Sequence, residues 1–207
     1  SYTYEDFVRG IVVNTETGTI EYNTVNKVLG EFAKKALQNW EDSKKQPEVL
    51  SKEKWVDEQF ELFKDDIDKE LADKEKIALT KAVGIFSIDE DAFRYKSDAE
   101  TWTTKGTRMH FADIKKAYLD ENEARQDVKK NKNISSQARE HASYYVRVLN
   151  RFQDFLSKNE IIYKPGDNAT VELQKYILII DEINRANLPA VLGELIYALE
   201  YREENVE

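Results

Sequence analysis

Two adjacent acidic residues, Asp181 and Glu182, directly follow an unbroken run of five apolar residues at positions 176–180. Such a run predicts a strand that is buried on both faces, as strands of parallel sheets are. Parallel α/β sheets place their ligands at the carboxyl ends of the strands, where this acid pair stands. An aspartate there can hold the coordination shell of Mg²⁺, and the glutamate beside it can polarise an attacking water. The alternative is a core strand followed by a solvated acidic turn.

Composition limits the chemistry that the rest of the chain can supply. The chain has 207 residues, 41% of them apolar and 34% charged, which is enough for one large or two small helix-rich domains with a real core. It contains no cysteine, which excludes disulfides and thiolate metal sites. The two histidines, His110 and His141, are isolated in sequence, which argues against a histidine metal site.

Charge is unevenly distributed along the chain. The formal net charge is −9, yet residues 101–170 carry 13 Lys and Arg against 9 Asp and Glu, a net charge of +4. Any contact with DNA or RNA should therefore lie in that segment. Two interpretations of the segment remain: a recognition module that contacts DNA or a partner subunit, or a helical decoration with a structural role. The candidate nucleic-acid contacts are Lys105, Arg108, Lys129, Lys130, Lys132, Arg139, Arg147 and Arg151.

The sequence contains no membrane signal. No apolar run approaches the roughly 18 residues that span a bilayer, and no signal peptide opens the chain. We therefore expect no membrane partner and a cytoplasmic location. The chain begins at Ser1 without an initiator methionine and ends in Glu-Glu-Asn-Val-Glu, so we interpret it as a piece of a longer protein.

The first third of the chain changes from a strand pattern to a helix pattern. Turn-rich residues between Gly10–Val13 and Thr19–Tyr22 predict a β-hairpin. An amphipathic helix is expected from Thr24, its N-cap, to Trp40. Pro47 marks a boundary, and a second helix follows it. The apolar stripe of that second helix consists of Val56, Phe60, Phe63, Ile67 and Leu71.

The middle and the end of the chain mix short strands with helices. Short strands are expected at 85–88, 93–96 and 101–103, then a turn at 105–108, an apolar segment at 109–111 and a short helix at 112–119. A polar stretch with a basic loop at 129–133 precedes a long helix at about 136–158. After the turn at Pro165 and the apolar run, Asn187 is expected to cap a last helix.

Two stretches of the sequence resemble the McrB family of AAA+ NTPases, which are motor subunits of modification-dependent restriction systems. Residues 179–188, IIDEINRANL, with Gly193-Glu194-Leu195 behind them, are similar to the extended Walker B motif of this family. Residues 1–10, SYTYEDFVRG, are similar to the segment that the family carries after its Walker A helix and the following strand. The order of the two stretches also agrees with the family.

The resemblance implies an AAA+ ring that hydrolyses ATP or GTP with Mg²⁺ and works on DNA with a nuclease subunit. It implies that Asp181 belongs to the Mg²⁺ shell and that Glu182 is the catalytic residue that orients or deprotonates the water. Asn184 and Arg185 would approach the nucleotide or the neighbouring subunit, whereas Asn187 is more simply a helix cap.

The chain also departs from the family pattern. It contains no Gly-x-x-x-x-Gly-Lys-Ser/Thr phosphate loop, and the sensor Asn and arginine finger that the family supplies after Walker B are missing. The resemblance implies that these parts lie outside this chain. We therefore expect the chain alone neither to bind nucleotide tightly nor to hydrolyse it.

The expected fold class is α/β with predominantly helical content. We expect a partial AAA+ core in residues 1–42 and 171–207, separated by an insertion over 43–170 that is mostly helical with a small β part near 84–111. The alternative is a non-catalytic interaction or DNA-binding module in which the acidic strand end is incidental. A phosphate-loop motif shortly upstream of Ser1 would distinguish the two.

Overall fold

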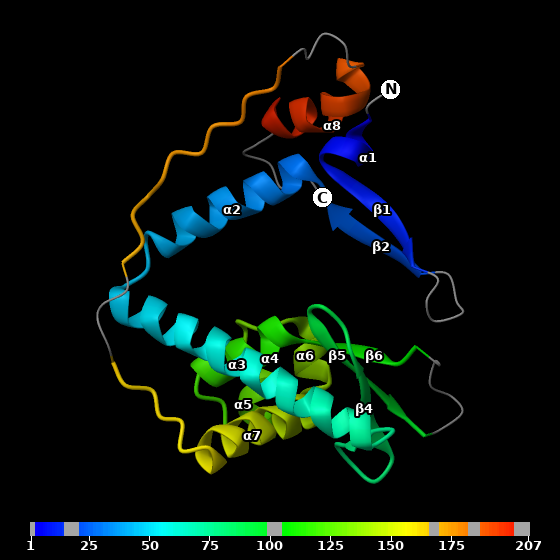
Figure 1. The fold of residues 1–207 in the computed structure, drawn as a ribbon, viewed down its shortest axis with the longest axis vertical. Coiled ribbons are helices and arrows are strands. Elements are labelled where there is room, and N and C mark those ends of the chain that lie inside the picture. Colours follow the sequence, from blue (N-terminus) through cyan, green and yellow to red (C-terminus); the bar gives the residue numbers. More distant parts are fainter. Residues whose placement is uncertain (1–2, 15–20, 99–104, 166–169, 182–186, 201–207) are drawn as a thin grey trace. The chain divides into compact units, whose positions relative to one another are not determined.

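The computed structural model describes residues 3–14, 21–98, 105–165, 170–181 and 187–200 (Figure 1). It is a mixed α/β structure, 54% helical, with two small antiparallel sheets, which agrees with the expected predominance of helix. Contacts divide the chain into two compact units, 1–45 with 170–207 and 46–169, so the second unit is inserted into the first. None of the helices in the described ranges is both long and apolar enough to cross a membrane.

The first unit begins with a short helix and a β-hairpin (Figure 1). Helix α1 spans Tyr4–Phe7, and the antiparallel strands β1 and β2 span Arg9–Asn14 and Glu21–Asn26. The hairpin predicted from the turn-rich residues is therefore present, but its second arm lies further along the chain than 19–22: Val13 pairs with Tyr22, and Gly10 pairs with Val25, which the sequence pattern had placed in the following helix. The turn that joins the two strands lies outside the described residues.

Helix α2 begins later than the sequence pattern suggested. It spans Val28–Asp42, because Thr24 is paired within β2 and therefore cannot cap the helix. The start of the helix is anchored where the Lys27 backbone N–H donates to Val8 O at 2.9 Å. A Cβ at Gly30 would lie 2.7 Å from Val8 O, so this close approach requires glycine.

The apolar stripe of α2 is a correct helical prediction, but it is not covered. Val28, Leu37 and Trp40 are exposed, and no residue of α2 is buried. Among the side chains of the first unit whose burial is described, the buried apolar ones are Val8 and Val191. A helix normally packs such a face against other elements. The described residues of this unit therefore present an uncovered apolar surface.

The second unit is organised around helix α3, which spans Pro47–Asp73. Pro47 lies in the first turn, where its missing N–H costs no hydrogen bond, so the predicted boundary is the start of the helix itself. The 3.6-residue periodicity correctly predicted the face of α3 that enters the core. The buried side chains of that predicted stripe are Val56, Phe60, Phe63 and Ile67.

Four short strands form the antiparallel sheet of the second unit, in the order β3-β4-β5-β6. They span Ile77–Ala78, Val83–Ile88, Ala92–Ser97 and Thr107–His110. In β5 the buried Phe93 and Tyr95 flank the less buried Arg94, as the alternation of a strand requires. One face of the sheet therefore contributes to the core.

The sequence correctly located the two central strands of this sheet. The strands predicted at 85–88 and 93–96 correspond to β4 and β5, whereas the one predicted at 101–103 lies outside the described residues. The turn predicted at 105–108 is shorter, because Thr107 already belongs to β6. Gly106 has a φ of +66°, and a Cβ there would lie 2.6 Å from the Phe86 ring, so this position needs glycine on both counts.

Helices α4, α5, α6 and α7 complete the second unit and span Phe111–Leu119, Arg125–Lys130, Ser136–Glu140 and Ala142–Lys158. Helix α3 packs against α4, α7 and β4 (Figure 1). The basic loop predicted at 129–133 is partly wrong, because Lys129 and Lys130 form the last turn of α5. The Asp127 carboxylate accepts from the Ala124 backbone N–H at 2.8 Å, which holds the start of α5 and lowers the pKa of Asp127.

The single helix predicted over 136–158 is broken at His141, which ends α6 and precedes α7. His141 Nδ1 lies 2.5 Å from the Tyr95 hydroxyl, and Ser135 Oγ caps α6 by accepting from Ala138 N at 3.1 Å. The apolar pattern continues through the break without interruption. The break is therefore associated with a tertiary contact that the periodicity could not reveal.

Aromatic side chains dominate the core of the second unit. Phe60 contacts the rings of Phe63, Phe93, Phe111 and Phe152, with centroid distances of 5.3 to 6.2 Å. Each such pair contributes about 0.5–1.5 kcal/mol beyond the burial of its area. The cluster joins α3, β5, α4 and α7 into one core.

Candidate functional site

Asp181 lies at the end of an extended, irregular segment and is exposed. Residues 170–180 form no strand, and Ile177 and Ile179 are 76% and 86% exposed. The prediction of a buried strand at 176–180 is therefore wrong for the described structure. A strand needs a neighbour for its backbone hydrogen bonds, and no described strand pairs with this segment.

One face of helix α2 contacts this extended segment. The side-chain amide of Asn39 donates from Nδ2 to Glu172 O at 3.0 Å, and its Oδ1 accepts from Gln174 N at 2.8 Å. Phe32 and Tyr176 make an edge contact, with ring centroids 5.8 Å apart. Phe32 and Asn39 lie two helical turns apart in sequence, so both point from the same face of α2. The helix therefore contacts the segment at two points.

Three of the four predicted nucleotide-site residues lie outside the described residues: Glu182, Asn184 and Arg185. The next described residue is Asn187, which directly precedes helix α8 at Leu188–Glu200. Asn187 therefore stands at the position predicted for the helix cap, and its carbonyl oxygen accepts from Ala190 N at 2.9 Å.

The chemistry of Asp181 fits a magnesium shell, although the described residues do not complete a metal site. No group of three or more His, Asp or Glu side chains in the described ranges could hold a metal ion. Magnesium in nucleotide sites is bound by one or two carboxylates together with water and phosphate oxygens. An exposed carboxylate at the end of an extended segment can supply one such oxygen ligand.

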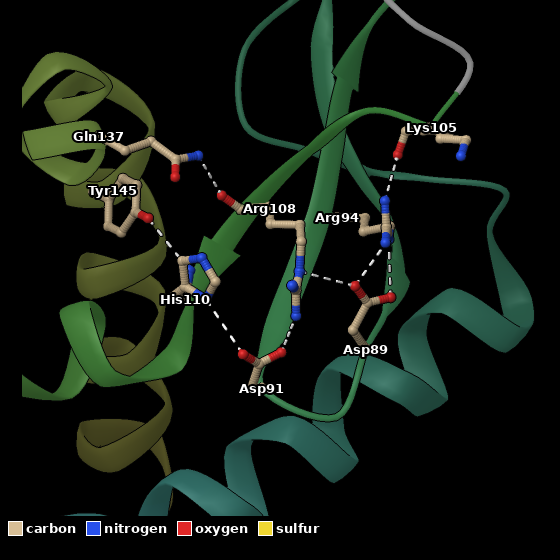
Figure 2. Close-up of polar contacts among 8 residues, drawn as sticks. All are labelled: Asp89, Asp91, Arg94, Lys105, Arg108, His110, Gln137 and Tyr145. Atoms are coloured by element: carbon tan, nitrogen blue, oxygen red, sulfur yellow. Dashed lines mark hydrogen bonds and ion pairs between the residues drawn. The ribbon is translucent and has the colours of Figure 1, made fainter. Parts of the chain in front are cut away.

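A network of charged side chains lies where β5 and β6 meet the turn between β4 and β5. Figure 2 shows Arg94 and Arg108, which pair across neighbouring strands, directed toward Asp89 and Asp91 in that turn. Arg94 Nε donates to the two Asp89 carboxylate oxygens at 2.9 and 2.8 Å. Arg108 Nε lies 3.2 Å from Asp89 Oδ2, and Arg108 Nη2 contacts Asp91. The two aspartates thus offset the repulsion between facing guanidinium groups.

His110 and Tyr145 extend this network to helix α7 (Figure 2). His110 Nδ1 lies 3.4 Å from Asp91 Oδ2, and the His110 backbone N–H donates to the Tyr145 hydroxyl at 3.3 Å. Burial, above all, raises the pKa of Tyr145, so its hydroxyl stays protonated. These contacts fix the sheet to the helix and leave the network a structural role.

A hollow of about 450 Å³ lies beside His110 and is lined by side chains of both charges. Lys64 is paired with Glu61 at 2.5 Å, and Lys115 with Asp57 at 2.6 Å. Asp113 also lines the hollow and accepts from the Ser135 N–H at 2.8 Å and from the Ser135 hydroxyl at 2.7 Å. Several of the charged groups that line the hollow are therefore paired with neighbouring side chains.

The structure separates the eight candidate nucleic-acid contacts by what they touch. Arg108 is paired with two aspartates, and Arg151 contacts Glu70. Arg139 donates to Ser136 Oγ at 2.9 Å, and Lys105 lies in the turn before β6, where its carbonyl oxygen accepts from Arg94. Four candidates remain exposed and make no ion pair with another described residue: Lys129, Lys130, Lys132 and Arg147.

Sequence reasoning missed two features of these sites. Asn39 carried no signal, because one polar residue beside an apolar stripe is indistinguishable from a solvated position. The network around Arg94 and Arg108 did carry one: Asp89 and Asp91 occupy the turn between two expected strands. Placing the following strand beside them would have indicated that acids face arginines.

No protein-family model matches the chain, and searches of the curated proteins and of the solved structures find no significant match. The resemblance to the McrB family therefore stays an expectation from the two sequence stretches at residues 1–10 and 179–195.

Proposed function

We propose that this chain belongs to an AAA+ NTPase and carries its magnesium-binding and water-activating acids. The observation that carries the proposal is the sequence IIDEINRAN at residues 179–187, with Asp181 and Glu182 at the end of an apolar segment. The extended backbone before Asp181 and its contacts with α2 support the proposal.

The acids have distinct roles in this proposal. Asp181 would hold Mg²⁺ directly or through its water shell, and the ion would supply positive charge to the phosphates of bound ATP or GTP. Glu182 orients the hydrolytic water and accepts its proton. Asn184 and Arg185 approach the nucleotide or the neighbouring subunit of a ring.

The uncovered apolar surface of the first unit also supports the proposal. Ile177, Ile179 and the stripe of α2 are exposed in the described structure. In an α/β core a strand of this composition lies inside a parallel sheet that helices cover on both faces. We propose that the intact protein supplies this sheet, and with it the phosphate loop, from outside these 207 residues. It would work in the cytoplasm with a nuclease subunit, in DNA restriction or remodelling.

The test is Glu182→Gln in the intact protein. The amide keeps the size of the side chain but cannot accept a proton, so turnover should fall by about 100-fold or more. Nucleotide affinity, measured separately by calorimetry, should change little because the phosphate and magnesium contacts remain. Glu172→Gln is the matched control, since Glu172 is an exposed acid on the same segment. Turnover that survives in Glu182→Gln would refute the proposed role.

A second candidate function is DNA contact by the inserted unit, which the exposed lysines at the end of α5 favour. Lys129, Lys130 and Lys132 fall within four residues and are exposed, and of the three Lys130 interacts electrostatically with Asp127. Changing all three lysines to Gln should weaken binding to duplex DNA. The slope of log K against log salt concentration should become less negative by about 0.9 for each phosphate contact that is lost. Lys34 and Lys35 of α2, also exposed, provide a control pair. Equal binding by both variants would favour the structural role of the insertion.

A further inference from the structure

We propose that Asn39 is a positioning residue that sets the register of the segment leading to Asp181. The inference rests on the proposed NTPase function, because it concerns how the magnesium ligand is placed. Its basis is the pair of hydrogen bonds from one side chain to two backbone groups, at 3.0 Å to Glu172 O and 2.8 Å from Gln174 N.

The pattern of these two bonds is that of a parallel β-ladder. In such a ladder one residue donates to the carbonyl before its neighbour and accepts from the N–H after it. The Asn39 amide makes this pair around Leu173, with Nδ2 in place of a backbone N–H and Oδ1 in place of a carbonyl. The side chain therefore substitutes for one residue of an adjacent strand, and a segment shifted by one residue could not form the same pair.

Helix α2 is suited to act as a fixed reference for this register. Its first turn is tied to the α1–β1 connection by the hydrogen bond from Lys27 N to Val8 O at 2.9 Å. Gly30 lets the helix approach the same carbonyl closely. The edge contact between Phe32 and Tyr176 adds a second point on the same helix face. Two contacts along one helix define both the position and the direction of the segment.

A shift in register would have a large effect at Asp181. An extended chain advances about 3.3 Å per residue, so a slip of one residue moves the carboxylate by that distance. The same slip also turns every side chain to the opposite face. Magnesium accepts oxygen ligands only near 2.0–2.1 Å in a nearly octahedral shell. The Asn39 amide thus bears on catalysis through Asp181 without touching the nucleotide.

The test uses Asn39→Leu, which keeps the approximate size of the side chain and removes both hydrogen bonds. Leucine favours helix more than asparagine does, so α2 should remain folded. In the intact protein we expect kcat to fall by about 10-fold or more, because misplacing a catalytic group by 1 Å can lower the rate by about 100-fold. KM for the nucleotide should change by less than about 3-fold. Asn39→Asp retains the acceptor for Gln174 N but loses the donor to Glu172 O, so its kcat should be intermediate.

The matched control is Gln38→Leu. Gln38 is the adjacent residue, and its side chain bonds Asp42 within α2 at 3.0 Å. Its replacement should leave kcat and KM unchanged. Hydrogen exchange of the 207-residue chain supplies a readout that is independent of catalysis: the amide of Gln174 should exchange faster in Asn39→Leu and at the normal rate in Gln38→Leu.

The outcomes separate the two proposals. If Glu182→Gln stops turnover while Asn39→Leu turns over normally, the NTPase proposal survives and the positioning role is overturned. A variant whose KM rises with kcat unchanged would also overturn it, because the effect would then lie in binding. If Glu182→Gln has full turnover, the NTPase role fails, and the positioning role, which depends on it, fails with it. Unchanged exchange at Gln174 refutes the amide clamp whatever the kinetics show.

Discussion

Replacing Phe60 by Ala should lower the free energy of unfolding of the second unit by about 3–5 kcal/mol. Phe60 is 1% exposed and contacts four other rings at 5.3 to 6.2 Å. Loss of the buried ring forfeits roughly 2–3 kcal/mol of transfer free energy. The remainder comes from the lost aromatic contacts and from the cavity left between α3 and α7. Small domains are stable by only about 5–15 kcal/mol, so this is a large share of the total.

Urea titration followed by circular dichroism measures this change. The control is Leu62→Ala, which alters the same helix two residues away at a side chain that is 51% exposed. Its expected cost is below about 1 kcal/mol, because little apolar area is lost and alanine is a good helix former. Both variants truncate an apolar side chain of α3 to alanine, one of them buried and the other half exposed. Equal destabilisation would show that the face of α3 assigned to the core is wrong.

Three further outcomes are expected. Gly106→Ala should destabilise the second unit by about 1 kcal/mol or more in thermal melts, because the φ of Gly106 is +66° and a Cβ there would lie 2.6 Å from the Phe86 ring. Gly193→Ala is the control and should not destabilise the protein, because a Cβ at Gly193 would meet no atom within 4 Å. Burial raises the pKa of Glu70, but hydrogen bonds and charge from Lys74 and Arg151 outweigh it, so the pKa lies below its ordinary 4.5. A carboxyl group whose pKa is lower in the folded state stabilises the fold above its unfolded pKa, and this stability is lost as the pH falls through the folded pKa. Glu70→Gln should therefore cost about 0.5–1 kcal/mol in urea titrations at neutral pH and progressively less in titrations at more acidic pH. Calorimetry of the 207-residue chain with ATP or GTP should show no tight binding, and a saturable heat would contradict the absence of a phosphate loop.

The hydrophobic periodicity of the sequence predicted those elements whose apolar faces are buried against other elements of the same chain. The stripe of α3 and the apolar positions of α7 were identified by their period, and in the structure they pack against each other. The break at His141 escaped prediction, because it accompanies a contact with Tyr95 that lies far away in sequence. Helix α5 escaped as well, since a six-residue helix with one buried side chain, Val128, has too few turns to show a period.

The apolar run at 176–180 shows the limit of the same reasoning. Composition indicates that a segment can be buried, but it does not indicate which part of a protein covers it. The described residues provide Phe32 and Asn39 on one side of this segment and leave Ile177 and Ile179 exposed. For the candidate site, the acid pair therefore stays a prediction from sequence, whereas the hydrogen bonds of Asn39 to the segment before it could be found only in the structure.

The position of Asn39 also explains how a compact unit can be inserted into the sequence shortly before the proposed site. The inserted unit begins at Gln46, shortly after Asn39, and ends at Ala169, shortly before Glu172. The amide pair therefore joins the two chain segments that enter and leave the insertion. With these segments tied together within the first unit, the length of the insertion adds only a slowly growing closure entropy. An insertion at this point leaves the register of Asp181 to α2, so it can vary in size without displacing the acid that would bind magnesium.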